Sequence, residues 1–466
     1  MARLHKTTHP DNDTIVAVIT PPGEGGIAAL RLAGPQTLPL LARFFRPQNT
    51  EPAEPTPFML RYGRFVSCEN EFVDEVMAVY MPHAKSYTGL EQAEIFCHGG
   101  RQVVRIIQDE LVAAGARIAE PGEFTRLAFL NGRIDLARAE AVAELIAANT
   151  KSSYAASREH LTGAYSEHVT RIREEIVGVI SELEAAIDFP DEEIPPADLE
   201  KIQKQIDSAA SQVKELINSY STGRIIKEGY KVVIAGRPNA GKSSLFNLLL
   251  KHERALVNPI PGTTRDYLSE WVEIDGVAVN LIDTAGLRER GGKIERMGQQ
   301  ASEEIIDGAD LVVWVVDLSS RGWEKKLSED LRKLSNKNMM LVGNKLDAVR
   351  SKVAKLKAVM STKMRPVSCK DGTAIHTFEM ELGWRITSSL PDLTSGLVVT
   401  SARHKQKLSA AHGGLRAAKK KLSVGESLEL VAFDLKHAAN AIDEIIGRVY
   451  TEQVLEQIFG KFCIGK

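Results

Sequence analysis

The first third of the chain alternates short apolar runs with turn residues, a pattern typical of a mixed α/β domain. The segment 103–114 has helical spacing of its apolar residues. The Pro-rich stretch 47–57 predicts a surface loop. The predicted strands are 14–19, 27–32, 77–81 and 93–98.

From about residue 127 the pattern becomes helical. The segment 134–150 is rich in the helix formers Ala, Leu and Glu. Between 172 and 187 apolar residues recur at steps of three and four, which predicts a long amphipathic helix with one buried stripe. Pro190 should stop this helix, and the next one should run from Pro195-Pro196 to about Tyr220, closed by Gly223.

Residues 230–385 alternate predicted strands and helices, which indicates a doubly wound, mostly parallel sheet. A hairpin is expected around Asp275-Gly276. After 397 helical spacing returns, first in a basic segment and then in an apolar one. We therefore predict an α/β plus all-α chain in which the doubly wound domain is inserted into a helical domain. The expected domain limits are 1–126 for the first α/β domain, 127–222 and 389–466 for the two helical parts, and 223–388 for the insertion.

Composition adds few constraints. Of 466 residues, 43% are hydrophobic and 26% are charged, and the net charge of −2 gives no overall basic face for nucleic acid. No apolar run approaches the ~20 residues of a membrane span. Cys68, Cys97, Cys369 and Cys463 lack zinc-site spacing. We expect reduced thiols in a cytoplasmic protein that does not contact a membrane.

The strongest chemical signal is the stretch from Gly236 to Ser243, which matches the phosphate-binding loop G-x-x-x-x-G-K-[ST] between an apolar strand and a helix. Its glycines let backbone N–H groups turn toward phosphate oxygens, and the helix N-terminus adds further donors. Lys242 should lie between the terminal phosphates, and Ser243 should bind Mg²⁺. The expected nucleotide contacts here are Asn239, Ala240, Gly241, Lys242, Ser243 and Ser244.

Four more motifs follow in order. The first, 261–266, lies between the predicted helix and the hairpin, and each of the others follows a predicted strand: 283–286, 344–347 and 368–370. Thr264 can complete Mg²⁺ coordination, while Asp283 can hold the ion through water and the N–H of Gly286 can reach the γ-phosphate. The carboxylate of Asp347 can accept two hydrogen bonds from guanine, which adenine cannot supply. Together the motifs predict binding of GTP and GDP. The remaining expected contacts are Asn258, Pro259, Ile260, Pro261, Gly262, Thr263, Thr284, Ala285, Asn344, Lys345, Ser368, Cys369 and Lys370.

This set resembles the translation-factor-like GTPases, with one departure. Leu287 follows Gly286 at the place where Ras-like enzymes carry the glutamine that orients the attacking water. An apolar side chain cannot do this. The enzyme therefore needs another group to position water and another source of positive charge.

The whole chain also resembles the MnmE (TrmE) family of bacterial and organellar tRNA-modifying GTPases. The similarity covers essentially the complete length, and the Gly262–Asp266 segment and the C-terminal Cys463–Lys466 tail are its most specific parts. The matching N-terminal motifs are Asp13-Thr14-Ile15-Val16-Ala17, Thr20-Pro21-Pro22-Gly23, Ser86-Tyr87-Thr88-Gly89, Cys97-His98-Gly99-Gly100, Gly122-Glu123-Phe124-Thr125-Arg126 and Asn131-Gly132-Arg133-Ile134-Asp135-Leu136.

The resemblance implies an N-terminal folate-binding-like domain, a discontinuous helical domain and an inserted Ras-like G domain. It implies a homodimer that joins the FAD-containing subunit MnmG in an α2β2-type complex. This complex modifies carbon 5 of the wobble uridine of certain tRNAs, with a reduced folate or related one-carbon donor. GTP hydrolysis with Mg²⁺ and K⁺ would accompany the reaction.

The resemblance also assigns roles to single residues. Asn239 matches a K⁺ ligand, helped by the backbone near Asn258, Ile260 and Thr263. Glu295 matches the acid credited with orienting water, and Cys463 is a further catalytic candidate. Arg31, Glu94, Arg133 and Lys466 match folate-contacting positions, although Arg133 replaces a Lys found in some members, which can change the contact geometry.

Simpler interpretations remain open for several of these residues. Glu295 could be a solvated surface acid, Arg31 and Glu94 could form a structural ion pair, and Cys463 could be an inert thiol. The basic run 416–421 is typical of a solvated helix face. The whole chain could instead be a regulatory GTPase switch in ribosome or RNP assembly, an alternative that tRNA analysis of a deletion strain distinguishes.

Overall fold

The structure is a computed structural model that describes residues 13–48, 55–188, 196–252, 254–255, 268–284, 305–333, 337–349, 363–389 and 397–466. The chain forms two compact units, and each is described by itself below. The first unit consists of Met1–Ala143, Ser166–Thr170 and Ile442–Lys466. The second consists of Glu144–Tyr165 and Arg171–Ala441.

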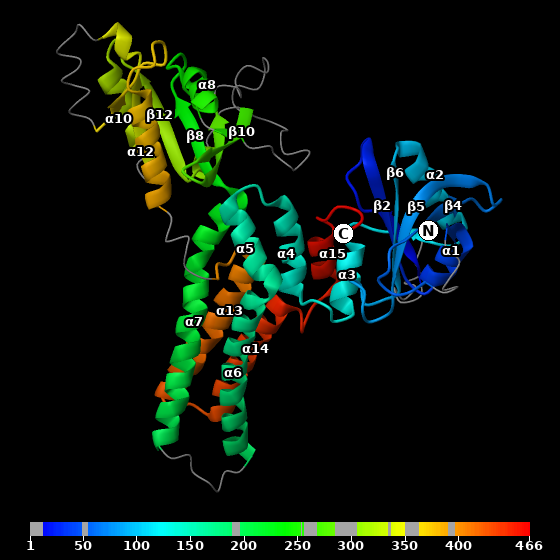
Figure 1. Cartoon of the computed structure of the whole chain (residues 1–466). Coiled ribbons are helices and arrows are strands. Elements are labelled where there is room, and N and C mark those ends of the chain that lie inside the picture. The colour runs from blue at the N-terminus through cyan, green and yellow to red at the C-terminus, as the bar shows by residue number, and fades with distance from the viewer. Residues whose placement is uncertain are drawn as a thin grey trace, which may run out of the picture. The chain divides into compact units, whose positions relative to one another are not determined.

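The first unit is built on a seven-stranded sheet with the order β3-β4-β5-β6-β2-β1-β7. Figure 1 labels its strands β2, β4, β5 and β6. Its strands pair antiparallel except for β1 with β7. Helices α1 (Thr37–Phe44) and α2 (Arg101–Ala113) share one apolar core with the sheet, which confirms a mixed α/β domain. The strands are β1 (Ile15–Val18), β2 (Gly25–Ala33), β3 (Phe45–Pro47), β4 (Arg61–Val66), β5 (Phe72–Met81), β6 (Gln92–Gly99) and β7 (Arg117–Ile118).

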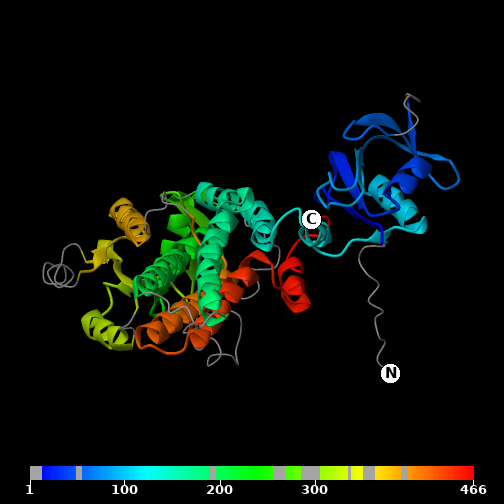
Figure 2. The same cartoon turned by 90° about the horizontal axis from the view of Figure 1, so that it is seen from below.

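The C-terminal end of the chain is part of this first unit. Side chains of α3 (Glu123–Leu130), the start of α4 (Leu136–Ala147) and α15 (Glu452–Phe459) bury a common cluster with Phe462. Pro121 forms a single antiparallel bridge with Ile464, and both views show the C-terminal end beside α3 (Figures 1 and 2). The last residues of the chain therefore lie against the segment that contains α3.

The second unit contains the doubly wound domain. Its sheet has the order β14-β13-β12-β8-β11-β10-β9, and it is parallel from β14 to β11 and antiparallel at β10 and β9. The hairpin turns at Asp275-Gly276, as predicted. The strands are β8 (Tyr230–Gly236), β9 (Arg254–Ala255), β10 (Leu268–Ile274), β11 (Val277–Asp283), β12 (Leu311–Asp317), β13 (Met339–Asn344) and β14 (Arg365–Pro366).

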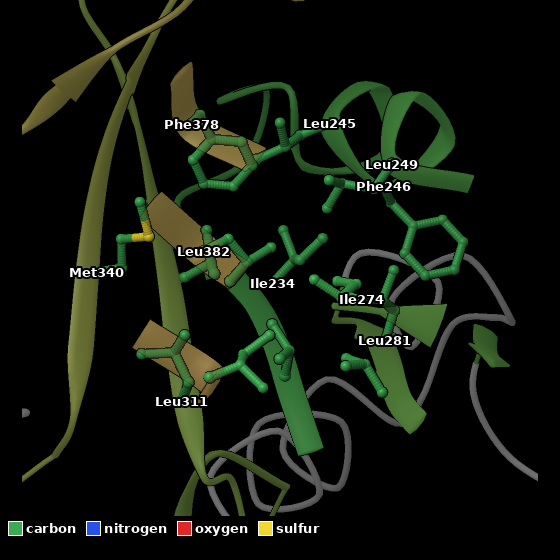
Figure 3. Close-up of a cluster of buried hydrophobic side chains, with 14 of the residues drawn as sticks. Ile234, Leu245, Phe246, Leu249, Ile274, Leu281, Leu311, Met340, Phe378 and Leu382 are labelled. Atoms are coloured by element: carbon green, nitrogen blue, oxygen red, sulfur yellow. The ribbon is translucent and has the colours of Figure 1, made fainter. Parts of the chain in front are cut away.

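Helices cover both faces of this sheet. Figure 3 shows Leu245 and Leu249 of α8 (Lys242–His252) and Leu382 of α12 (Ile375–Ser388) gathered around the central strands. A separate cluster joins Trp323 of α10 (Trp323–Lys333) to the far end of β12. These two buried layers confirm the predicted doubly wound arrangement.

The remaining helices of the second unit form the helical domain: α5 (Lys151–Thr162), most of α6 (Ala164–Asp188), α7 (Pro196–Glu228), α13 (Ala402–Ser423) and the first part of α14 (Leu428–Ile446). Helix α7 precedes the doubly wound domain and α13 follows it, yet the two helices pack against each other. Asp207 and Lys419 form an ion pair between them. The doubly wound domain is therefore an insertion, as the sequence predicts.

Two helix limits differ from the prediction. Helix α7 does not close at Gly223 but continues to Glu228, because this glycine provides close packing rather than a cap. A Cβ on Gly223 would lie 2.2 Å from the carbonyl oxygen of Val399. The segment predicted as one helix at 134–150 ends at Ala147, and Thr150 then caps α5 through a capping box with Ser153. Among the described helices, none is both long and apolar enough to cross a membrane.

Candidate nucleotide-binding site

The loop between β8 and α8 has the backbone shape of a phosphate cradle. Gly236, Asn239 and Gly241 all have positive φ angles, of 146°, 61° and 93°. A Cβ on Gly236 would lie 2.3 Å from Val315 O, so a larger residue cannot take its place. Helix α8 begins at Lys242, and its first N–H groups lack intrahelical partners. The loop thus presents backbone donors and the positive end of a helix to an anion.

Two polar residues at the end of this loop, Lys242 and Ser243, make side-chain contacts with the loop and with Asp283. Lys242 is 8% exposed, and its Nζ donates to Arg237 O at 3.2 Å. The Oγ of Ser243 donates to Oδ2 of Asp283 at 2.7 Å, and Asp283 is fully buried. The neighbouring Thr284 donates through its hydroxyl to Ile234 O at 3.1 Å. A hydroxyl beside a carboxylate fits the all-oxygen ligand set of Mg²⁺.

Asn344 connects the phosphate loop to the segment expected to bind the base. Its Nδ2 donates to Ala240 O at 2.9 Å, and its Oδ1 accepts from Cys369 N at 3.1 Å. The Oδ1 of Asp347 accepts from Ser368 Oγ at 3.0 Å. The structure therefore brings three separated motifs together at one edge of the sheet, as the sequence predicts.

One contact of this site escapes the sequence reasoning. Lys345 has a φ of 65°, and its Nζ donates to Oδ2 of Asp317 at 2.7 Å. Burial pushes the pKa of Asp317 upward, but hydrogen bonds from Lys345 and Ser319 outweigh this, so the pKa lies below its usual value. Asp317 ends β12, beside the strand that carries Asn344. A carboxylate at the end of a neighbouring parallel strand is the signal that could have revealed it.

Three of the remaining described candidates lie on the surface. Asn239, Ser244 and Lys370 are exposed. Burial raises the pKa of Cys369 to about 11, so its thiol stays neutral near pH 7 and is no nucleophile. Ten candidates lie outside the described residues and stay predictions: Asn258, Pro259, Ile260, Pro261, Gly262, Thr263, Thr264, Ala285, Gly286 and Glu295.

A second group of candidate residues lies in the first unit. Arg31 on β2 and Glu94 on β6 are cross-strand neighbours, and their side chains pair at 2.8 Å. The guanidinium of Arg31 also lies 5.6 Å from the ring centres of both Tyr87 and Phe124. Both charged side chains are less than one fifth exposed. The pair is therefore held in a fixed orientation by a partly buried aromatic surround.

The C-terminal tail reaches this group within the same chain. Phe124 N donates to Lys466 O at 3.1 Å, and Gly122 N donates to Cys463 O at 3.4 Å. Arg133 does not join the ion pair; its Nη1 donates to Ala84 O at 3.0 Å. Ala84 and Tyr87 belong to the same loop, which connects β5 to β6. The structure thus brings Lys466 beside Phe124 and ties Arg133 to the loop of the second aromatic ring.

Comparisons with known proteins cover almost the entire chain. The family model of the MnmE helical domain matches residues 136–463, and that of the GTP-binding protein TrmE N-terminus matches residues 14–133. The tRNA modification GTPase MnmE of Symbiobacterium thermophilum is 40% identical over 463 residues, covering 97% of this chain and 99% of the relative. The corresponding protein of Natranaerobius thermophilus is 39% identical with the same coverage.

Among solved structures, the G domain of the T. maritima FeoB iron transporter is 26% identical, covering 33% of this chain and 96% of that one. Its TM-score is 0.25, so the assignment does not depend on it. The two family models and the full-length relatives carry the conclusion, and the phosphate loop with its associated motifs agrees with it. The chain belongs to the MnmE family of tRNA modification GTPases.

Proposed function

We propose that this GTPase is stimulated by potassium and works with the FAD-containing subunit MnmG to modify carbon 5 of the wobble uridine of certain tRNAs. A reduced folate or related one-carbon donor supplies the carbon. The observation that supports this most is the assembled nucleotide site, in which Ser243 contacts Asp283 and Asn344 connects the phosphate loop to Cys369. Family membership extends the proposal to tRNA.

The proposal assigns the nucleotide chemistry to residues of the second unit. Lys242 neutralises the terminal phosphates, and Ser243, Thr264 and the buried Asp283 hold Mg²⁺, directly or through water. Asp347 selects guanine. Mg²⁺ supplies charge stabilisation for phosphoryl transfer when it is bound.

Leu287 stands where Ras-like enzymes carry a glutamine, so the reaction needs another source of positive charge, and a potassium ion supplies it in this proposal. Asn239 is exposed in the phosphate loop, where its side chain would help to hold a monovalent cation that supplies positive charge to the reaction. Backbone groups near Asn258, Ile260 and Thr263 complete this cation site in the proposal. Sodium is smaller and should substitute poorly. Replacing Asn239 by Ala should remove the difference in turnover between potassium and sodium buffers while GTP affinity is kept.

Glu295 positions the attacking water in this proposal, and Gly286 contributes its N–H to the γ-phosphate. Loss of a general base typically costs 10²- to 10⁴-fold in rate. We therefore expect Glu295→Ala to lower turnover by roughly 10²-fold or more with little change in nucleotide affinity. Unchanged turnover would remove Glu295 from the mechanism.

The one-carbon donor binds at the Arg31–Glu94 group. Glu94 is an acceptor for the N–H groups of a pterin, and Arg31, Arg133 and Lys466 are partners for the carboxylates of a glutamate tail. Cys463 lies beside this site, as a nucleophile or as a positioning group. The contacts of the tail with Gly122 and Phe124 support a site made from both ends of one chain.

The proposed assembly is a homodimer through the N-terminal domains, joined by MnmG as an α2β2-type complex in the cytoplasm. Domain limits of 1–126, 127–222 with 389–466, and 223–388 belong to the same proposal.

Nucleoside mass spectrometry of tRNA tests the proposal as a whole. A strain that lacks this chain should lose the carbon 5 modification of the wobble uridine, and the wild-type chain should restore it. The same measurement in a strain that lacks MnmG should give the same loss. Unaltered wobble nucleosides in the first strain would reject the proposal and favour a regulatory switch in ribosome assembly.

A further inference from the structure

Helix α13 of the helical domain has an unusual charge pattern. It runs from Ala402 to Ser423 with many Lys and Arg residues and with no Asp or Glu. Its buried face consists of His404, Leu408, Ala411, Leu415 and Ala418, so most of its cations lie on the flanks and the outer face. The sequence alone is compatible with a simple solvated face. The contacts of α13 with the neighbouring helix α7 show whether its cations are instead gathered into a binding surface.

Helices α7 and α13 run antiparallel along a common seam. Asp207 pairs with Lys419 at one end, and at the other the Nζ of Lys405 lies 4.6 Å from the ring centre of Tyr220. Between these contacts lie Lys214 on α7 and, on α13, His412 and Arg416. We call Lys214, Lys405, His412 and Arg416 the basic seam.

The charges of the basic seam act on one another. The pKa of His412 lies below its usual value because of burial first, and then because of repulsion by Arg416 and Lys214. Cations from two different helices therefore converge on the same point. Near pH 7 this favours a neutral His412 flanked by two permanent positive charges.

The positive charge of the seam is not neutralised within the described part of the chain. Lys214 and Arg416 are exposed, and neither forms an ion pair with another described residue. The acid next to Lys214 in sequence, Glu215, lies about 100° further around α7. An outside anion is therefore the natural partner of the seam.

We propose that the basic seam binds the sugar–phosphate backbone of tRNA. The identity of the RNA rests on the proposed function. Lys405 and Arg416 are separated by eleven residues of one helix, which is about 16 Å at 1.5 Å per residue. A single nucleic acid strand carries one phosphate per about 3.4 Å of axis, so several phosphates can lie along this length. Phosphate contacts of this kind position an RNA without reading its sequence.

The test uses the full chain and an unmodified, fluorescently labelled tRNA transcript with a uridine at the wobble position. Binding is measured by fluorescence anisotropy over a series of salt concentrations. The double variant Lys214→Gln/Arg416→Gln removes two charges of the seam. Lys201→Gln/Lys436→Gln is the matched control, because it removes two exposed lysines of the same helical domain that pair with Glu182 and Glu184.

We expect the seam variant to bind tRNA roughly tenfold more weakly, the scale of one or two charged hydrogen bonds. Its plot of log K against log salt should become shallower by about 1 for each lost phosphate contact. The control should match the wild type in both. GTP hydrolysis without tRNA should be unchanged in all three proteins, which shows that they are folded.

Equal affinity and equal salt slope in wild type and seam variant would overturn the proposal, and so would an absence of tRNA binding by the wild-type chain. A defect confined to binding of MnmG would make the seam a protein contact and would also overturn it. These outcomes are independent of the proposed function, because wobble modification in the deletion strain is measured separately. That strain can confirm the modification activity even when the seam proves irrelevant to tRNA.

Discussion

The two candidate sites of this chain are built in opposite ways. The nucleotide site uses consecutive loops of one inserted domain, and its key contacts involve backbone groups: Asn344 with Ala240 O, and Lys242 with Arg237 O. The Arg31–Glu94 site uses a cross-strand ion pair between two aromatic rings and receives the last residues of the chain. Each lies within its own compact unit.

This difference explains how readily each site can be recognised. A phosphate cradle needs backbone N–H groups at fixed positions, and this requirement leaves glycines at fixed spacing in the sequence. An ion pair such as Arg31–Glu94 needs only two residue types that meet across strands, and many sequences contain such residues far apart. The first site therefore leaves a sequence motif, whereas the second leaves none that spacing alone can identify.

The largest effect is expected at the guanine-selecting position. Asp347→Asn should weaken GTP binding by roughly 10²-fold or more, because two hydrogen bonds to a charged acceptor are lost. It should improve binding of xanthosine triphosphate, since Asn can donate to the 2-oxo group. Titration with fluorescent analogues of both nucleotides checks this. Asp307→Asn, at an exposed acid that pairs with Lys337, is the matched control. An unchanged preference for GTP would show that Asp347 does not select guanine.

Removal of the tail tests the independence of the two sites. Deleting Cys463–Lys466 should leave GTP hydrolysis nearly intact, because the candidate nucleotide-binding residues lie within the second unit. It should lower affinity for 5-formyl-tetrahydrofolate at least tenfold and abolish wobble modification, since one charged contact contributes about that much. Isothermal calorimetry gives the folate affinity. Equally tight folate binding by the truncated protein and by Glu94→Ala would show that the tail and Glu94 do not form the site.

Sequence reasoning predicted most of the fold, and it predicted phosphate-loop and base-binding motifs that the structure brings into contact, for identifiable physical reasons. Strand and helix periods revealed the doubly wound domain, and the helical segments on both sides revealed the insertion. It was wrong about the end of α7, because Gly223 serves close packing against Val399, and no local pattern distinguishes a packing glycine from a cap. It missed the contact of Asp317 with Lys345 because the two residues lie 28 positions apart, so only the place of the carboxylate at the end of the neighbouring strand indicates it. The family resemblance grouped Lys466 with Arg31 and Glu94, but neither it nor the spacing predicted the backbone contact of Lys466 with Phe124.

Two glycines offer a reciprocal test of the comparison. Gly241 has a φ of 93°, and a Cβ there would lie 2.1 Å from Nδ2 of Asn344. Gly465 has a φ of 96°, and a Cβ there would lie 2.5 Å from Val18 O. Alanine at either position should cost about 1–3 kcal/mol of local strain. Gly241→Ala should weaken GTP binding roughly tenfold or more and spare folate binding, whereas Gly465→Ala should do the reverse. A loss of both GTP binding and folate binding in either variant would mean that the two sites are coupled.

The smallest effect is expected at the ion pair that the sequence did not reveal. Asp317→Asn should lower the stability of the inserted domain by about 1 kcal/mol or less at pH 7, because Lys345 is more than one third exposed and water screens the pair. The pKa of Asp317 is lowered in the folded state, so its contribution is present above the unfolded pKa of about 3.9 and disappears as the pH falls through the folded value. Urea unfolding followed by tryptophan fluorescence measures this domain selectively, because all four tryptophans, Trp271, Trp314, Trp323 and Trp384, belong to it. The difference between wild type and variant should be constant from pH 8 to 5 and should shrink below about pH 4. A stability difference that does not change with pH would show that the charge of Asp317 contributes nothing. The candidate nucleotide site would then depend even more on contacts with backbone groups, in contrast to the Arg31–Glu94 ion pair.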